Sequence, residues 1–105
     1  MRENAYQAYL KGLIEQTFLG AVVIKNDSGY LQGIPDLLVL FGERWAMLEV
    51  KVSRDAATQP NQEYYVNLFN DMSYANFIYP ENEEEVLHDL QLIFTSRRQA
   101  RIPKR

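Results

Sequence analysis

Apolar residues change their spacing several times along the chain, and each spacing predicts one element. From Glu3 to Phe18, tyrosines, leucines and an isoleucine recur at helical intervals, which predicts an amphipathic helix. Three short apolar runs then predict strands, at Ala21–Ile24, Asp36–Phe41 and Trp45–Val52. This alternation of helical and strand periods indicates a domain of the α/β class.

The second half of the chain adds two helices and one strand. Pro60 begins a helical segment whose apolar stripe is predicted to face the core, and this stripe consists of Tyr64, Tyr65, Leu68, Phe69 and Met72. Asn76–Tyr79, ended by Pro80, predicts a fourth strand, and Asn82 is expected to cap a last helix that reaches Phe94. The predicted order is α-β-β-β-α-β-α, with no internal repeat.

The loop between the second and third predicted strands sets their register. A two-residue loop, Gly42-Glu43, pairs Phe41 with Arg44, whereas a three-residue loop pairs Phe41 with Trp45. Glycine at the first central position is typical of type II′ hairpin turns. The two-residue loop is therefore predicted, or a longer loop that keeps the same parity.

This register decides whether three charged residues share a face of the sheet. With a two-residue loop, Asp36 lies opposite Glu49, and Lys51 shares the face of Glu49 by the two-residue period of a strand. Their face also carries Leu38, Leu40 and Met47, and the opposite face carries Leu37, Val39, Leu48, Val50 and Val52. Because both faces are apolar, the hairpin is predicted to be covered on both sides.

The spacing of Asp36, Glu49 and Lys51 is that of a metal-dependent nuclease site. Two carboxylates can hold a divalent cation, and a lysine beside them can orient and acidify an attacking water. A charge at the end of a strand is usually just solvated, but Glu49 lies inside an apolar strand, where a charge is costly unless it is paired or metal-bound. The pattern predicts hydrolysis of phosphodiester bonds.

Composition restricts the kind of metal ion that the chain could bind and its cellular location. The chain has 105 residues, of which 47% are hydrophobic, and this suits one domain with a modest core. It has no cysteine and one histidine, so a metal would be bound mostly by oxygen, which favours Mg²⁺ or Mn²⁺, and no organic cofactor is expected. Its apolar runs are strand-sized, so we expect no membrane association and a cytoplasmic protein.

Charge is distributed unevenly, and this bears on nucleic-acid binding. The formal net charge is −3, but residues 97–105 hold five of the eleven basic residues and none of the fourteen acidic ones. A basic tail suggests an arm that contacts phosphates, although a solubilising terminus explains it equally well. The candidate nucleic-acid contacts are Lys25, Tyr30, Gln32 and Arg54 in the body and Arg97, Arg98 and Arg101 in the tail.

Three motifs together resemble the PD-(D/E)XK nuclease superfamily, and more narrowly its VRR-NUC branch. They are Gly33-Ile34-Pro35-Asp36-Leu37, Leu48-Glu49-Val50-Lys51 and Pro60-Asn61-Gln62. The resemblance implies a restriction-endonuclease-like α-β-β-β-α-β core with a mixed central sheet flanked by helices, followed by a C-terminal helix. Residues 1–96 would form the nuclease domain and residues 97–105 the basic tail.

The resemblance also assigns roles to individual residues. Asp36 and Glu49 would bind the metal together with the carbonyl of Val50, and Lys51 would stabilise the attacking water or the developing negative charge. Gln62 would orient Lys51 or the scissile phosphate, although a polar residue in the first turn of a helix needs no such role. The metal-binding glutamate of the first helix is expected to be Glu3, with Glu15 as the alternative.

These features favour a Mg²⁺- or Mn²⁺-dependent endodeoxyribonuclease that acts on branched DNA. By resemblance, such a protein would act like a Holliday-junction resolvase and form a homodimer. A non-catalytic DNA-binding or assembly module that keeps the fold is the alternative, and RNA or a simple DNA end is an alternative substrate. An acidic protein–protein adaptor is the remaining possibility.

Overall fold

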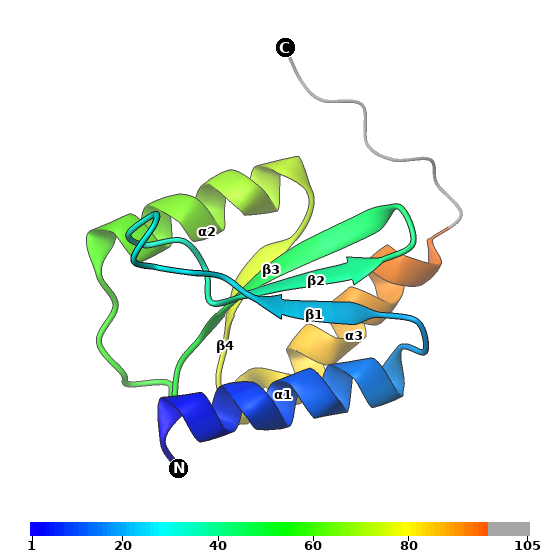
Figure 1. The fold of residues 1–105 in the computed structure, drawn as a ribbon, viewed down its shortest axis with the longest axis horizontal. Helices are drawn as coiled ribbons and strands as arrows, with labels where there is room; N and C mark the ends of the chain where they lie inside the picture. The colour runs from blue at the N-terminus through cyan, green and yellow to red at the C-terminus, as the bar shows by residue number, and fades with distance from the viewer. Residues whose placement is uncertain (97–105) are drawn as a thin grey trace.

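A four-stranded mixed sheet with helices on both faces organises residues 1–96, which are the residues that the computed structural model describes (Figure 1). The elements are α1 (Glu3–Thr17), β1 (Val22–Lys25), β2 (Leu37–Phe41), β3 (Arg44–Val50), α2 (Pro60–Met72), β4 (Ala75–Ile78), a 3-10 turn η1 (Pro80–Asn82) and α3 (Glu83–Thr95). The predicted α/β class and order of elements are confirmed. Arg97, Arg98 and Arg101, and the predicted tail, lie outside the described residues.

Strand order in the sheet follows the chain, β1-β2-β3-β4. The first three strands form an antiparallel meander, and β4 pairs in parallel with β3. A parallel neighbour requires a crossover, and the connection through α2 supplies it. Among residues 1–96, no helix is long and apolar enough to cross a membrane.

The β2–β3 hairpin has the predicted two-residue register. Phe41 pairs with Arg44 and Leu37 pairs with Leu48. Gly42 has a φ of +61°, as the first central position of such a turn requires. The ladder ends at Leu37, and continuing it by one step sets Asp36 opposite Glu49.

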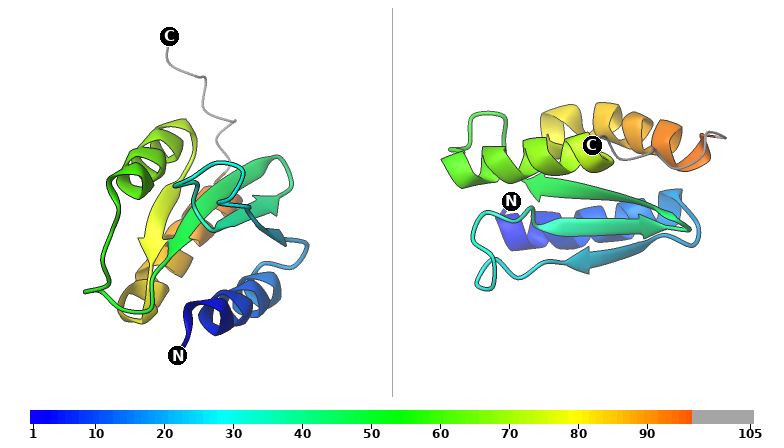
Figure 2. Two further views of the ribbon diagram at one scale, coloured as in Figure 1. Left: turned by 60° about the vertical axis from the view of Figure 1, so that its left-hand side comes forward. Right: turned by 90° about the horizontal axis from the view of Figure 1, so that it is seen from above.

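The two faces of the sheet are covered unequally (Figure 2). Helices α1 and α3 pack on one face, where Val39, Leu48 and Val50 are fully buried. Helix α2 contacts β3 and β4 on the other face and leaves β1 and β2 without a helix there. Helices therefore cover both faces mainly over β3 and β4, and β2 of the hairpin lacks the expected cover on this face, because this face receives a single helix.

The prediction for the α2 stripe was wrong in which residues face the sheet. Tyr64 is 60% exposed and Met72 is 58% exposed, whereas Val66 is buried. The row that meets the sheet also includes Phe69, whose ring packs edge-on against Trp45 with centroids 6.2 Å apart. The apolar stripe of α2 is wider than the row of residues that contacts the sheet, because α2 is rotated so that its first turn reaches the end of β3.

Asn82 begins α3 as predicted, but its side chain does not cap that helix. Its amide instead accepts a hydrogen bond from the backbone N–H of Tyr79 at 2.8 Å and donates one to the carbonyl of Phe77 at 3.0 Å. Asn82 therefore closes the turn after β4, and the acidic first turn of α3 is left to complement the helix dipole.

Gly33 is predicted to be essential for the approach of the β1–β2 connection to α2. Its φ is +93°, and a Cβ at this position would lie 2.8 Å from Cγ of Asn61. Gly33→Ala should therefore lower the free energy of unfolding by about 2 kcal/mol or more, since it adds backbone strain and overlap. Urea unfolding measures the change.

The matched control is Gly12→Ala, in the interior of α1, where an added Cβ meets nothing within 4 Å. This substitution should raise stability by about 0.5–1 kcal/mol. Equal effects of the two substitutions would contradict the close approach at Gly33.

Candidate active site

Three predicted site residues meet where β2 begins and β3 ends. Asp36 directly precedes β2, Glu49 is the penultimate residue of β3, and Lys51 directly follows that strand. Glu49 is 3% exposed and Lys51 8% exposed, which is rare for charged residues. The chain therefore buries a carboxyl group and an ammonium group at the same end of its sheet.

Gln62, in the first turn of α2, connects these two buried groups. Its Nε2 donates to Oε2 of Glu49 at 3.0 Å, and its Oε1 accepts from Nζ of Lys51 at 2.9 Å. The same Oε1 accepts from the backbone N–H of Gln59 at 3.0 Å, which caps the helix. Gln62 therefore bonds at the start of the helix and also contacts both buried groups.

Lys51 is fixed by the protein on more than one side. Its ammonium donates to the carbonyl of Ala57 at 2.9 Å, in addition to its bond with Gln62, and lies 3.8 Å from Oε2 of Glu49. These contacts fix the position of the Lys51 ammonium group beside the carboxyl group of Glu49.

Asp36 is oriented by the backbone of β3. Its Oδ2 accepts a hydrogen bond from the N–H of Val50 at 2.9 Å. A side-chain hydrogen bond also joins the carboxyl groups of Asp36 and Glu49. The two carboxyl groups therefore lie together at the end of the hairpin.

The electrostatics of the acid pair are strongly perturbed. Burial raises the pKa of Glu49 from 4.5 to about 8, with the negative charge of Asp36 acting in the same direction and Lys51 opposing both. A hydrogen bond with Asp36 also favours the protonated form of Glu49. The Glu49 carboxyl therefore keeps its proton to a higher pH than an exposed glutamate does, as is typical of closely spaced carboxyl groups.

The two glutamates proposed on α1 have different surroundings. The pKa of Glu3 is raised, first by burial and then by the charge of Asp36, so Glu3 lies within electrostatic reach of the site. Glu15 instead accepts hydrogen bonds from Lys11 at 2.7 Å and from the N–H of Val23 at 3.2 Å, and both lower its pKa. This geometry favours Glu3 over Glu15.

Gln7 is a site neighbour that the sequence analysis did not select. It is 5% exposed, and its Nε2 donates to Oε2 of Glu3 at 3.4 Å. Among the buried side-chain nitrogen and oxygen atoms of residues 1–96, Oε1 of Gln7 is the one without a hydrogen-bond partner. The i, i+4 spacing of Glu3 and Gln7 was the available signal, but periodicity alone cannot show that a glutamine is buried.

The donor set suits a hard cation, although the acidic residues do not enclose one. Within residues 1–96, no group of three or more His, Cys, Asp and Glu side chains is placed to hold a metal ion. Mg²⁺ keeps several waters and needs only one or two carboxylates, so Asp36, Glu49 and a backbone carbonyl fit it. The single histidine, His88, is exposed on α3.

The proposed nucleic-acid contacts in the body surround this end of the sheet. Lys25 is exposed, and its Nζ lies 3.4 Å from the amide oxygen of Asn4 at the start of α1. Tyr30 is 91% exposed, and Gln32 is exposed in the same connection between β1 and β2. Arg54 is exposed in the connection between β3 and α2.

Comparisons with known protein families, with curated proteins and with solved structures gave no match. The functional argument is therefore made from the site itself. Asp36, Glu49, Lys51 and Gln62 meet, Glu3 lies within electrostatic reach, and Gln7 joins them from α1.

The raised pKa of Glu49 predicts how stability depends on pH without metal. The unfolded chain releases this proton near pH 4.5, whereas the folded protein keeps it until about pH 8. Folding therefore binds a proton in this window, and the free energy of unfolding should fall as pH rises through it. In Glu49→Gln, most of this decrease in the free energy of unfolding should disappear. Thermal unfolding at a series of pH values in EDTA measures the difference.

The control is Glu15→Gln, because the pKa of Glu15 is shifted in the opposite direction. This variant should keep the alkaline loss of stability. An unchanged pH profile in Glu49→Gln would show that Glu49 ionises normally in the folded protein.

Proposed function

We propose that this protein is a metal-dependent endodeoxyribonuclease that acts on branched DNA. The observation that carries the proposal is the linked set Glu49, Gln62 and Lys51, with Asp36 opposite Glu49 in the hairpin register. Two carboxyl groups, an ammonium group and an amide therefore lie at one end of the sheet, and this combination suits metal-dependent hydrolysis of phosphodiester bonds.

A purely structural role explains this set poorly. Burying a carboxyl group beside an ammonium group gives little or no net stability relative to apolar residues of similar size. Strongly perturbed carboxyl groups in a cluster are instead typical of functional sites. Neither a DNA-binding module nor an adaptor requires two negative groups facing one another next to a fixed lysine.

The chemistry divides among the side chains according to their positions. When bound, a divalent cation would supply Lewis-acid stabilisation of the phosphate and acidify a water. Asp36, Glu49 and the carbonyl of Val50 would hold it, with Glu3 near the same charge. The ammonium of Lys51 would orient the attacking water and stabilise the negative charge that develops on the phosphate. Gln62 positions both Lys51 and Glu49.

The preference for branched DNA rests on the sequence resemblance. Residues 1–96 carry six basic and fourteen acidic residues, so DNA of any shape meets repulsion over most of this surface. Binding would then depend on local contacts at Lys25 and Arg54 and on the basic tail. Cleavage of cellular or phage DNA would take place in the cytoplasm.

Cleavage of a labelled four-way junction, compared with a matched duplex and a matched RNA in Mg²⁺ or Mn²⁺, tests the proposal. Metal-dependent cutting that favours the junction is expected. Lys51→Ala and Asp36→Asn should each lower the rate by about 100-fold or more, since each removes a charge that acts in the transition state. Lys51→Met keeps the buried volume and should lose activity equally.

Circular dichroism and Mg²⁺ binding separate chemistry from folding. The lysine variants should remain folded and bind metal, whereas Glu49→Gln should also bind metal more weakly. Wild-type rates in a folded Lys51→Ala would refute the site assignment. Equal cutting of junction and duplex would keep the nuclease and remove the preference for branches.

We further propose that two copies act together, through the open edge of the sheet. Strand β1 is an edge strand, and its outward side chains Val22 and Ile24 are 50% and 43% exposed. Exposed β-branched residues on an unpaired edge favour pairing with another strand. A chain of 105 residues also offers little surface for a four-way junction, and a dimer doubles it.

Ile24→Lys tests this arrangement with little risk to the fold, since the position is already half-exposed. Light scattering should show a dimer for the wild type and a monomer for the variant, because a buried charge opposes pairing. A monomeric wild type at micromolar concentration would contradict the dimer without affecting the nuclease.

A further inference from the structure

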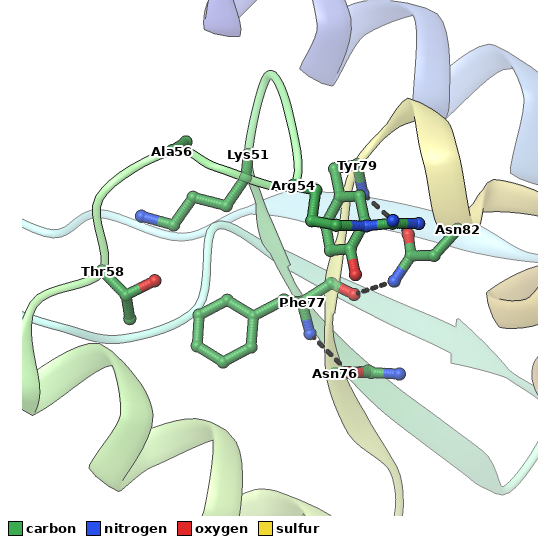
Figure 3. A pocket seen from close by; sticks show the side chains of 8 residues that line it. All are labelled: Lys51, Arg54, Ala56, Thr58, Asn76, Phe77, Tyr79 and Asn82. Atoms are coloured by element: carbon green, nitrogen blue, oxygen red, sulfur yellow. Dashed lines mark hydrogen bonds between the residues drawn. The ribbon is translucent and has the colours of Figure 1, made fainter.

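A hollow adjoins the site on the side of β4. It lies between the connection that follows β3 and the end of β4, and Lys51 lines it as well as the site. In Figure 3, Lys51 and Thr58 lie to one side, Arg54 and Tyr79 lie to the other, and the ring of Phe77 lies below them. Its volume of about 230 Å³ suits a small planar group.

The parallel pairing of β3 and β4 places aromatic residues directly beside the catalytic ones. Glu49 pairs with Phe77, and the N–H of Lys51 donates to the carbonyl of Ile78, the residue before Tyr79. Neighbouring strands lie about 4.8 Å apart. A nucleotide next to the scissile phosphate would therefore reach Phe77 and Tyr79.

The lining of the hollow provides aromatic surface for stacking and a positive charge, but few polar groups that could recognise a particular base. Phe77 and Tyr79 are half-buried, and the amides of Asn76 and Asn82 already bond within the protein. Arg54 is exposed and makes no hydrogen bond or ion pair with any of residues 1–96. Aromatic faces beside a free cation are what binds single-stranded nucleic acid without strong sequence preference.

We propose that this hollow is a nucleotide subsite that receives one unpaired base of the DNA substrate, next to the phosphate that is cut. The inference rests on the proposed nuclease function and narrows its substrate class to DNA whose nucleotide at the cleavage position is unpaired or unpairs at a branch point. The base stacks on Tyr79, the ring of Phe77 lines the hollow beside it, and Arg54 contacts a flanking phosphate. A base stacked within a duplex cannot enter, so continuous duplex is excluded.

Fluorescence of 2-aminopurine tests the subsite directly. The probe base is placed unpaired at a branch point and, in a second DNA, paired within a duplex, and each is titrated with the full chain carrying Asp36→Asn to prevent cutting. The unpaired probe should be quenched by stacking, and adding Tyr79→Ala should weaken binding about tenfold and abolish the quenching. Tyr79→Phe should behave as the parent.

Two further variants keep the test decisive. Tyr64→Ala removes a tyrosine that is 60% exposed on α2, away from the hollow, and should leave quenching unchanged. If Tyr79→Ala does not fold, Arg54→Ala replaces it, because Arg54 is exposed. Arg54→Ala should weaken DNA binding and should reduce the slope of the logarithm of the binding constant against the logarithm of the salt concentration by about the amount expected for one phosphate contact.

The outcomes separate this subsite from the nuclease proposal. Quenching that survives both Tyr79→Ala and Arg54→Ala, or equal quenching of the paired probe, overturns the subsite even if the wild type cuts DNA. An unpaired probe that the parent neither binds nor quenches also overturns it. If the wild type cuts no substrate but the quenching still depends on Tyr79, the result supports the subsite and refutes the nuclease proposal.

Discussion

The hydrogen bonds of Gln62 constrain the site and the packing of α2 together. One amide group caps the helix, accepts from Lys51 and donates to Glu49, so the helix axis and the two charged groups cannot move independently. This constraint explains why Val66 and Phe69, rather than the whole apolar stripe, meet the sheet. It also explains how a buried carboxyl group and a buried ammonium group are tolerated, since each has a hydrogen-bond partner.

Much of this arrangement could be predicted from local sequence signals. Gly42 identified the two-residue turn, and the turn fixed the parity that places Asp36 opposite Glu49. The β-branched runs and the helical stripes identified the four strands and the three α-helices of residues 1–96, because their periods differ clearly, but not the 3-10 turn η1. The sequence resemblance suggested the contact of Gln62 with Lys51 but not its hydrogen bond to Glu49.

Other features depend on tertiary placement and were not accessible in this way. The exposure of Tyr64 and Met72 reflects the rotation of α2, which long-range hydrogen bonds set. The buried Gln7 depends on how α1 crosses the sheet, and the partners of Asn82 depend on the end of β4. The hollow beside Lys51 arises only because β4 is the parallel neighbour of β3, and no spacing in the sequence specifies that neighbour.

The connection between β3 and α2 has a consequence for how such a protein can diverge. It contains no helix or strand, contributes the backbone acceptor of Lys51 through Ala57, and forms one wall of the hollow through Arg54, Ala56 and Thr58. The paired carboxyl groups, in contrast, belong to the hairpin. Insertions or substitutions near Arg54 would therefore reshape the wall while the hairpin keeps its geometry. Under the proposed function, the wall of the hollow and the paired carboxyl groups thus belong to separate segments, and the wall can change by small steps while the carboxyl pair is kept.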